Sequence, residues 1–200
     1  MKLSINLNTS SYDVIIEESL SRKLSSYLNK FNKGQKFILC FPSKLSLHIP
    51  EIISELKNNN YNIQQLKIND GEQFKTLEYT QELVQSLMKL NCKTDTILLA
   101  LGGGTVGDII GFLSSIFMRG IRYINIPTTL LAMVDSSIGG KTGVNYNGIK
   151  NMLGTFHHPE LVCIDPKFLR SLTEKQIYSG IGEIVKYGLI SNQKILSTLI

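Results

Sequence analysis

The hydrophobic pattern along the chain alternates between short apolar runs and segments with helical spacing. Short runs predict strands at residues 37–41, 63–68, 96–101, 123–126 and 161–164. Helical spacing predicts helices at residues 18–28, after Pro50, at 77–90, at 104–118 and from Thr173 onward. Residues 2–16 alternate polar and apolar positions, which predicts a β-hairpin that turns near residues 8–11.

Strands and helices that alternate in this way form an open, mostly parallel sheet with helices on both faces. We therefore predict a Rossmann-like α/β fold. Sheets of this kind bind ligands at the carboxyl ends of their strands. The loops expected at those ends, and therefore the candidate binding segments, are residues 70–75, 102–108, 127–141 and 168–171.

The composition fits a folded protein that binds a small ligand. Hydrophobic residues make up 42% and charged residues 18% of the 200 residues, which argues against disorder. The net charge of +5 suits an anionic ligand, but on charge alone a solvated lysine-rich surface is the preferred explanation. No apolar run is long enough to span a bilayer, and no zinc-finger spacing or basic stripe suggests nucleic acid. Three separated cysteines in apolar runs predict a reduced, cytoplasmic protein.

A glycine-rich loop is the first candidate for chemistry. Residues 102–108 read Gly-Gly-Gly-Thr-Val-Gly-Asp, follow a predicted strand and open a predicted helix. Bare N–H groups at such a helix N-terminus can face a pyrophosphate, and a tight turn without ligand is the alternative. The acid that usually contacts the ribose about 20 residues later is missing, because the next strand ends in Ile126-Pro127-Thr128-Thr129.

A series of motifs in fixed order resembles the 3-dehydroquinate synthases, a family of sugar phosphate cyclases. The matching segments are residues 70–75 (DGEQFK), 102–108 (GGGTVGD), 127–131 (PTTLL), 134–142 (VDSSIGGKT), 148–152 (GIKNM) and 179–188 (SGIGEIVKYG). Arg119 and Gly120 follow the glycine loop at the distance typical of that family. Because the resemblance covers almost the whole chain, it is far more specific than any single motif.

The resemblance implies a reaction and its cofactors. The family converts 3-deoxy-D-arabino-heptulosonate 7-phosphate (DAHP) into 3-dehydroquinate and phosphate, using NAD catalytically and one divalent metal, zinc or cobalt. Its members continue into a helical domain whose two histidines complete the metal site. We therefore expect residues 1–172 to form the NAD-binding domain and residues 173–200 an incomplete start of the helical domain, so that the chain alone is inactive.

The expected cofactor site gathers residues from the loops at the strand ends. Its predicted members are Asp70, Gly71, Glu72, Gln73, Phe74, Lys75, Gly104, Thr105, Val106, Gly107, Asp108, Thr128, Thr129, Lys141, Lys150, Phe168, Leu169, Arg170 and Ser171. Simpler explanations exist for several of them. Asp70-Gly71 is an ordinary turn sequence, Asp108 suits the first turn of a helix, and threonine before an apolar run is a helix cap.

The expected catalytic residues face the phosphate substrate. They are Arg119, Asp135, Lys141, Lys150, Asn151 and Lys186, with Glu183 as the metal ligand. The resemblance implies that Arg119 acts across a homodimer interface, whereas a surface charge at a helix end is the alternative. Glu183 and Lys186 share a helix face, so a surface ion pair is the alternative there. Nothing in the motifs assigns a metal to the histidines, which are His48, His157 and His158.

Two further classes of function remain open at this point. Other sugar phosphate cyclases and metal-dependent polyol dehydrogenases share this layout of strands and motifs. A nucleotide-binding module without chemistry is the second alternative. Residues 42–44, Pro-Ser-Lys, stand where many members of the resembling family place an Asp or Asn for the adenosine ribose.

Overall fold

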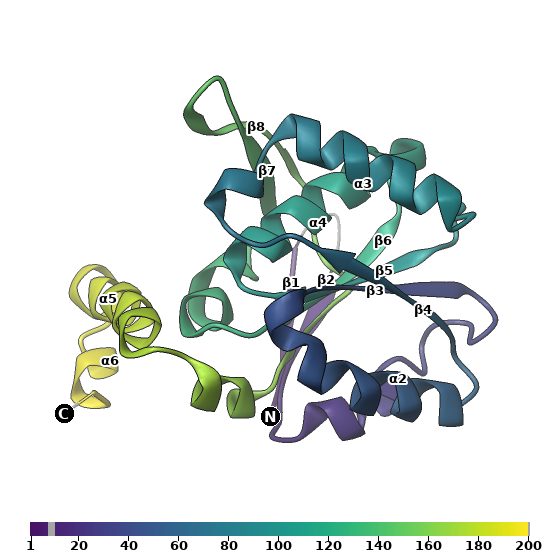
Figure 1. Ribbon diagram of the computed structural model, residues 1–200. Coiled ribbons are helices and arrows are strands. Elements are labelled where there is room, and N and C mark those ends of the chain that lie inside the picture. The colour runs from purple at the N-terminus through teal and green to yellow at the C-terminus, as the bar shows by residue number, and fades with distance from the viewer. Residues whose placement is uncertain (8–10, 200) are drawn as a thin grey trace.

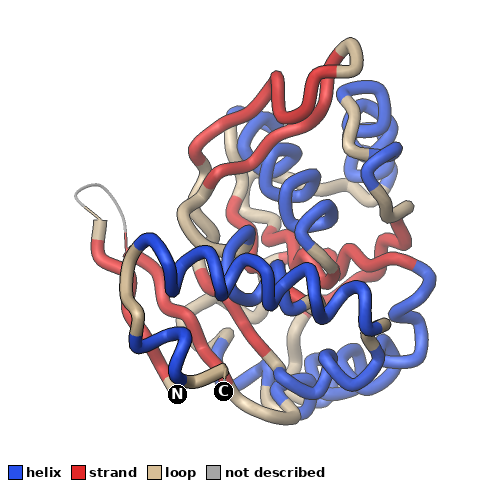
Figure 2. The backbone as a smooth tube through the Cα atoms, turned by 90° about the vertical axis from the view of Figure 1, so that its left-hand side faces the viewer, coloured by secondary structure: helices blue, strands red, loops and turns tan. Residues whose placement is uncertain are grey.

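The protein is built around an open sheet that separates two layers of helices. The computed structural model describes residues 1–7 and 11–199. The sheet has seven strands in the order β1-β2-β9-β6-β5-β3-β4 (Figures 1 and 2). Their bounds are Lys2–Asn6 (β1), Ser11–Ile16 (β2), Lys36–Pro42 (β3), Asn62–Ile68 (β4), Ile97–Gly102 (β5), Arg122–Pro127 (β6) and Leu161–Ile164 (β9). All neighbours are parallel except β1 and β2, which confirms the predicted α/β class.

Helices cover both faces of this sheet and bury two hydrophobic cores. Helix α2 (Ile49–Asn58) lies on one face, and α3 (Leu77–Lys89) and α4 (Gly104–Ile116) lie on the other (Figure 1). Alternate residues of β3 and β5 point to opposite cores, so Leu99 packs on the α2 side and Leu98 on the α4 side. Residues 37–42 of β3 and 97–102 of β5 are therefore all apolar and buried, which is why each appears as a continuous run in the sequence.

The first helix was predicted too long. Residues 18–28 form only a 3₁₀ turn at Leu20–Arg22 and the single turn α1 at Leu24–Tyr27. Ser19 has a left-handed φ of 58° and Lys23 a φ of −134°, and both values interrupt a helix. The hairpin of β1 and β2 is confirmed by the pairing of Lys2 with Ile15. Its predicted turn lies partly outside the described residues, since residues 8–10 are not described.

A second, two-stranded sheet was not predicted. Strands β7 (Lys141–Tyr146) and β8 (Ile149–Phe156) form an antiparallel hairpin beside α4 (Figure 1). Asn147 and Gly148 form its turn with φ values of 48° and 77°, as a type I′ turn requires. Close packing anchors the hairpin, because a Cβ on Gly111 of α4 would lie 2.4 Å from the Thr142 methyl carbon. The hairpin therefore forms a wall above the carboxyl ends of the strands.

The C-terminal helices project from the sheet domain. Helix α5 (Glu174–Ile190) begins at the predicted place, with a capping box formed by Thr173 and Gln176. The short α6 (Lys194–Ser197) packs on α5, and a 3₁₀ segment at Pro166–Ser171 connects them to β9 (Figure 1). A search of the described residues finds no helix with the length and apolar character needed to cross a membrane.

Candidate active site

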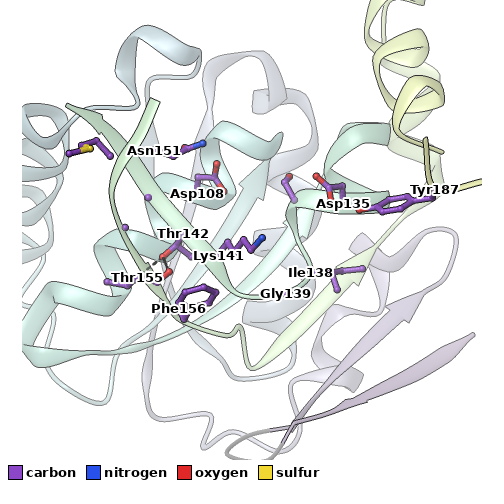
Figure 3. A pocket seen from close by; sticks show the side chains of 14 residues that line it. Asp108, Asp135, Ile138, Gly139, Lys141, Thr142, Asn151, Thr155, Phe156 and Tyr187 are labelled. Carbon is purple, nitrogen blue, oxygen red and sulfur yellow. Dashed lines mark hydrogen bonds between the residues drawn. The ribbon is translucent and has the colours of Figure 1, made fainter. Parts of the chain in front are cut away.

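A cleft of about 720 Å³ opens at the carboxyl end of the sheet (Figure 3). It lies between the β7–β8 hairpin, the start of α4, helix α5 and a π-helical turn at Ala132–Ser136, called η5. The residues that line it are Asp108, Asp135, Ser136, Ile138, Gly139, Lys141, Thr142, Gly143, Asn151, Met152, Gly154, Thr155, Phe156 and Tyr187. Four of the predicted site residues are among them: Asp108, Asp135, Lys141 and Asn151.

A buried lysine connects two of these residues from below the cleft. Lys75 is 5% exposed, and its ammonium contacts the Asp108 carboxylate and donates to Asn151 Oδ1 at 2.6 Å. Burial raises the pKa of Asp108, and the Lys75 ammonium partly offsets that effect. A buried charge needs such a partner, because removing one member would leave the other uncompensated. The predicted cofactor residue Lys75 is therefore engaged with the protein itself.

The other residues of the 70–75 segment lie at the rim beside Lys75. Asp70 forms an ion pair with Lys44, which belongs to the Pro42-Ser43-Lys44 segment. Gly71 has a φ of 117°, a conformation that favours glycine, and a Cβ there would meet the Gln73 amide at 2.6 Å. Phe74 packs on Tyr79 of α3 at 5.4 Å between ring centroids. Glu72 and Lys150 approach each other at 3.8 Å, so the structure brings these two predicted residues together.

The glycine loop begins α4 as predicted. Gly103 is the N-cap, and a Cβ on Gly104 would lie 2.7 Å from Ser136 Oγ. Gly107 has a packing role, because a Cβ there would lie 3.0 Å from the Asn125 amide nitrogen of β6. Thr105 lies in the first turn of α4, and Val106 is buried in the core on the α4 side.

An unpartnered hydroxyl beside the glycine loop, that of Ser136, fits a bound dinucleotide. The Ser136 and Ser137 hydroxyls are buried, and neither has a hydrogen-bond partner among the described residues. Buried polar atoms of this kind usually bind something. Ser136 also lines the cleft, so its hydroxyl and the N–H groups at the start of α4 together suit a pyrophosphate at this place. The sequence interpretation did not assign these serines, although both lie in the VDSSIGGKT motif.

The threonines after β6 support the same loop. Thr128 is buried and its backbone N–H donates to the Gly102 carbonyl at 2.8 Å. The Thr129 hydroxyl accepts from the backbone N–H of Ala132 at 3.3 Å, which is the predicted helix cap. A Cβ on Gly103 would lie 3.2 Å from the Thr129 methyl carbon. Both threonines therefore shape the glycine loop. They were predicted to bind the cofactor at this same place.

A tyrosine on α5 binds a carboxylate in the cleft. The Tyr187 hydroxyl donates to Asp135 Oδ1 at 2.5 Å, which joins α5 to η5. This bond raises the pKa of Tyr187 to about 12, and the Glu183 carboxylate contributes in the same direction. Tyr187 was not predicted as a site residue, although it belongs to the matched KYG segment.

The predicted metal ligand also lies on this part of α5. Glu183 forms an ion pair with Lys186 on one helix face and lies one turn of α5 before Tyr187, which lines the cleft. Within residues 1–7 and 11–199, no group of three His, Cys, Asp or Glu side chains is arranged to hold a metal. Glu183 thus offers one oxygen ligand, of a type that suits divalent metals in general.

The remaining predicted residues lie away from the cleft. Arg119 is exposed at the end of α4 with a φ of 69°. Phe168 is buried in the core on the α2 side, and Leu169 packs against that core. Arg170 and Ser171 are exposed in the 3₁₀ segment that leads to α5. The structure therefore does not bring the 168–171 segment into the lining of the cleft.

The three histidines pack against aromatic side chains, and the buried Nδ1 of His158 has no hydrogen-bond partner among the described residues. His157 Nε2 lies 2.9 Å from the Ile121 carbonyl oxygen, and its ring stacks on Tyr123 at 5.5 Å. His158 stacks on Tyr12, and His48 packs edge-on against Phe168 at 5.1 Å. The contacts of His157 and His158 tie the segment after β8 to strands β6 and β2, whereas the His48 contact joins two 3₁₀ segments.

Comparison with known proteins identifies the family. The sequence profile described as 3-dehydroquinate synthase N-terminal matches residues 65–179. The chain belongs to the 3-dehydroquinate synthase family. A 3-dehydroquinate synthase of Clostridium tetani (strain Massachusetts / E88) is 43% identical over 187 residues, which are 93% of this chain and 50% of the relative. One of Prochlorococcus marinus (strain MIT 9312) is 38% identical over 99% of this chain and 55% of the relative. The chain spans about half the length of these curated relatives.

Solved structures agree with this family and its fold. A 2-deoxy-scyllo-inosose synthase, complexed with carbaglucose-6-phosphate, NAD⁺ and Co²⁺, has a TM-score of 0.86 at 27% identity over 95% of this chain and 52% of its own. ValA, a 2-epi-5-epi-valiolone synthase from Streptomyces hygroscopicus subsp. jinggangensis 5008 with NAD⁺ and Zn²⁺ bound, has a TM-score of 0.85 at 30% identity over the same shares. A glycerol dehydrogenase from Schizosaccharomyces pombe has a TM-score of 0.67 at 18% identity over 88% of this chain and 42% of its own. At this identity, the similarity to the glycerol dehydrogenase shows only a shared fold.

Proposed function

We propose that this chain is the NAD-binding half of a 3-dehydroquinate synthase, a lyase that converts DAHP into 3-dehydroquinate and phosphate. The observation that carries the proposal is the cleft beside the glycine loop. It gathers Asp108, Asp135, Lys141 and Asn151 from three of the motifs that resemble the 3-dehydroquinate synthase family. The names of the relatives that match nearly the whole chain support the same reaction.

The cofactor site would form around the start of α4. The N–H groups at Gly103 and Gly104 and the hydroxyl of Ser136 would hold the pyrophosphate of NAD. The 70–75 segment would cover its other side. When bound, NAD would take a hydride from a substrate carbon and return it later in the same cycle. The protein's own part is to hold the dinucleotide against the cleft where the substrate lies.

Charged and amide side chains of the cleft would bind the substrate. Lys141 is exposed in the cleft wall, and a compact lysine charge suits a phosphate or a developing oxyanion. Lys150 at the rim and Lys186 on α5 would add positive charge. Asp135, held by Tyr187, would accept a hydrogen bond from a substrate hydroxyl. Asn151 would donate to a substrate oxygen.

The metal and the homodimer complete this proposal. Glu183 would contribute one ligand to a zinc or cobalt ion, and the other ligands would come from residues outside this chain. When bound, the metal would polarise a substrate hydroxyl. Arg119 would reach the phosphate across a homodimer interface. Its neighbours Ile116 and Met118 are exposed apolar residues, which suits a contact with a second copy.

Two assays test this function. Titration calorimetry of the 200-residue chain should detect NAD binding, while phosphate release from DAHP with NAD and zinc should stay at background. A fusion of this chain to the second half of the C. tetani relative should release phosphate without net NADH formation. Full turnover by the chain alone would contradict the proposal that it carries only the NAD-binding half of the active site. Net NADH formation from glycerol by the fusion would instead support a polyol dehydrogenase.

A further inference from the structure

Asn145 lies at an irregular position of the β7–β8 hairpin. The pairing of the two strands shifts between Val144 and Tyr146, so residues 150–152 of β8 form a bulge-like irregularity opposite the single residue Asn145 of β7. Bulges bend a strand and redirect a side chain, and they are frequent next to active sites. Here the half-buried Asn145 side chain turns toward the segment that contains Glu72 and Lys75.

Three hydrogen bonds join Asn145 to both sides of the cleft rim. Its amide nitrogen donates to Glu72 Oε1 at 2.9 Å, and its amide oxygen accepts from the Asn151 backbone N–H at 2.9 Å. Its own backbone N–H donates to the Lys75 carbonyl oxygen at 2.7 Å. The loop after β4 and the strand β8 are thus held together by one residue.

The chemistry of the partners fixes the orientation of the Asn145 amide. A carboxylate such as Glu72 only accepts hydrogen bonds, and a backbone N–H such as that of Asn151 only donates. The nitrogen must therefore face Glu72 and the oxygen must face Asn151. Neither an aspartate nor an apolar residue at position 145 can make both bonds.

The same contacts set the orientation of Asn151. Asn151 has a φ of 54°, a conformation that is uncommon for residues other than glycine, and the bond to Asn145 supports it. Its side-chain oxygen accepts from the Lys75 ammonium at 2.6 Å. Because that oxygen is engaged, the amide nitrogen is the group that Asn151 offers to the cleft (Figure 3). A donor at this place selects a ligand oxygen with a free lone pair.

We infer that Asn145 is a positioning residue, which holds the Glu72–Lys75 segment against β8 so that Asn151 presents a hydrogen-bond donor to the ligand. The inference deepens the proposed function and rests on it only for the identity of the ligand. The contact itself exists without ligand. It is measured separately by the hydrogen exchange of the Asn151 backbone amide, whose partner is the Asn145 side chain.

Hydrogen exchange of the 200-residue chain by NMR tests the contact. In Asn145→Ala, the Asn151 amide should exchange at least about tenfold faster than in the parent, because it loses its acceptor. In Asn145→Asp, that amide should stay protected, since a carboxylate still accepts. The matched control is Asn147→Asp, which adds the same charge to the turn of the same hairpin. Unchanged protection in Asn145→Ala would overturn the inference.

NAD titration with a rescue variant tests the effect on the site. Asn145→Asp places a carboxylate opposite Glu72, and NAD affinity should fall about tenfold. Adding Glu72→Gln restores a donor opposite the new carboxylate, so the double variant should bind NAD as tightly as Glu72→Gln alone. Equal affinity in Asn145→Asp and Asn147→Asp would overturn the positioning role. If the parent binds no NAD, the proposed function fails, and hydrogen exchange still decides the contact.

Discussion

Individual glycines of the α4 loop have different physical roles. Gly107 permits close packing on β6, whereas Gly104 faces Ser136 at the cleft. Gly102, Gly104 and Gly107 follow the spacing G-x-G-x-x-G. In this loop Gly107 meets a packing requirement, and Gly104 leaves the helix N-terminus open. Only the open helix N-terminus bears on ligand binding. A substitution at Gly104 can therefore test ligand binding without changing the packing at Gly107.

Gly104→Ala should weaken NAD binding without unfolding the protein. The new methyl group would lie 2.7 Å from Ser136 Oγ, a hydroxyl that can rotate away, so the fold should tolerate it. The methyl would still occupy space that a pyrophosphate needs, and we expect affinity to fall at least about tenfold, by roughly 1.4 kcal/mol. Titration calorimetry measures the change, and thermal unfolding checks the fold. Equal affinity in variant and parent would mean that the loop is only a turn.

The Tyr187–Asp135 bond should make one tyrosine titrate late. The pKa of Tyr187 is raised from 10.0 to about 12, because ionised Tyr187 could no longer donate to Asp135 and would face its carboxylate. The folded value exceeds the unfolded one, so the bond contributes fully below pH 10 and is lost as the pH rises through about 12. A tyrosinate absorbance titration of the parent minus Tyr187→Phe should show a single group near pH 12. A difference centred near pH 10 would contradict the bond.

The sequence motifs allowed many residues of the site to be predicted. They did not predict which of these side chains contact one another. Motif matches supplied Asp108, Asp135, Lys141 and Asn151, which the fold brings to one cleft. The contacts of Lys75 with Asp108 and Asn151 join residues 33 and 76 positions apart. Such contacts depend on how loops fold over the sheet, and no local pattern encodes them. The roles inferred for these residues stay predictions.

At the scale of elements, the hydrophobic pattern predicted the strands of the seven-stranded sheet but not those of the β7–β8 hairpin. The central buried strands are continuous apolar runs, whereas β7 and β8 contain Lys141, Asn145 and two glycines, Gly143 and Gly154. The overlooked signal is Asn147-Gly148, the preferred sequence of a two-residue type I′ turn. For residues 18–28, in contrast, the sequence pattern predicted a continuous helix that the structure does not contain. Helical spacing was present there, but the left-handed backbone at Ser19 interrupts it.

Two glycines within α5 should respond oppositely to alanine. A Cβ on Gly180 would lie 2.5 Å from Leu130 Cγ, whereas one on Gly182 would meet no atom of the described residues within 4 Å. Gly182→Ala should therefore stabilise by about 0.5–1 kcal/mol through helix propensity. Gly180→Ala should destabilise the docking of α5 by about 1–3 kcal/mol through overpacking. Hydrogen exchange of the α5 amides measures both, and equal effects of the same sign would contradict the packing at Leu130.

At the scale of the whole molecule, the two hydrophobic cores lie entirely within the sheet domain. The cores and the side chains packed against them end at Leu169, and α5 contributes to neither. Helix α5 is joined to the domain through Gly180 against Leu130 and through the Tyr187–Asp135 bond. Its exposed apolar residues include Tyr178, Leu189 and Ile190. This arrangement agrees with a unit that ends at residue 172, which stays a prediction until the parts are separated.

Truncation after Leu172 should leave a cooperatively folded α/β domain. Because both cores remain, the thermal midpoint should change by less than about 5 °C. A matched truncation after Asp165 also removes Phe168, which is 4% exposed, and loss of a buried phenylalanine costs about 3–5 kcal/mol. That second variant should therefore unfold at a much lower temperature. Circular dichroism in the near and far ultraviolet follows both. If the first truncation lost its near-ultraviolet signal, α5 would be part of the folding unit, and the boundary at residue 172 would be wrong.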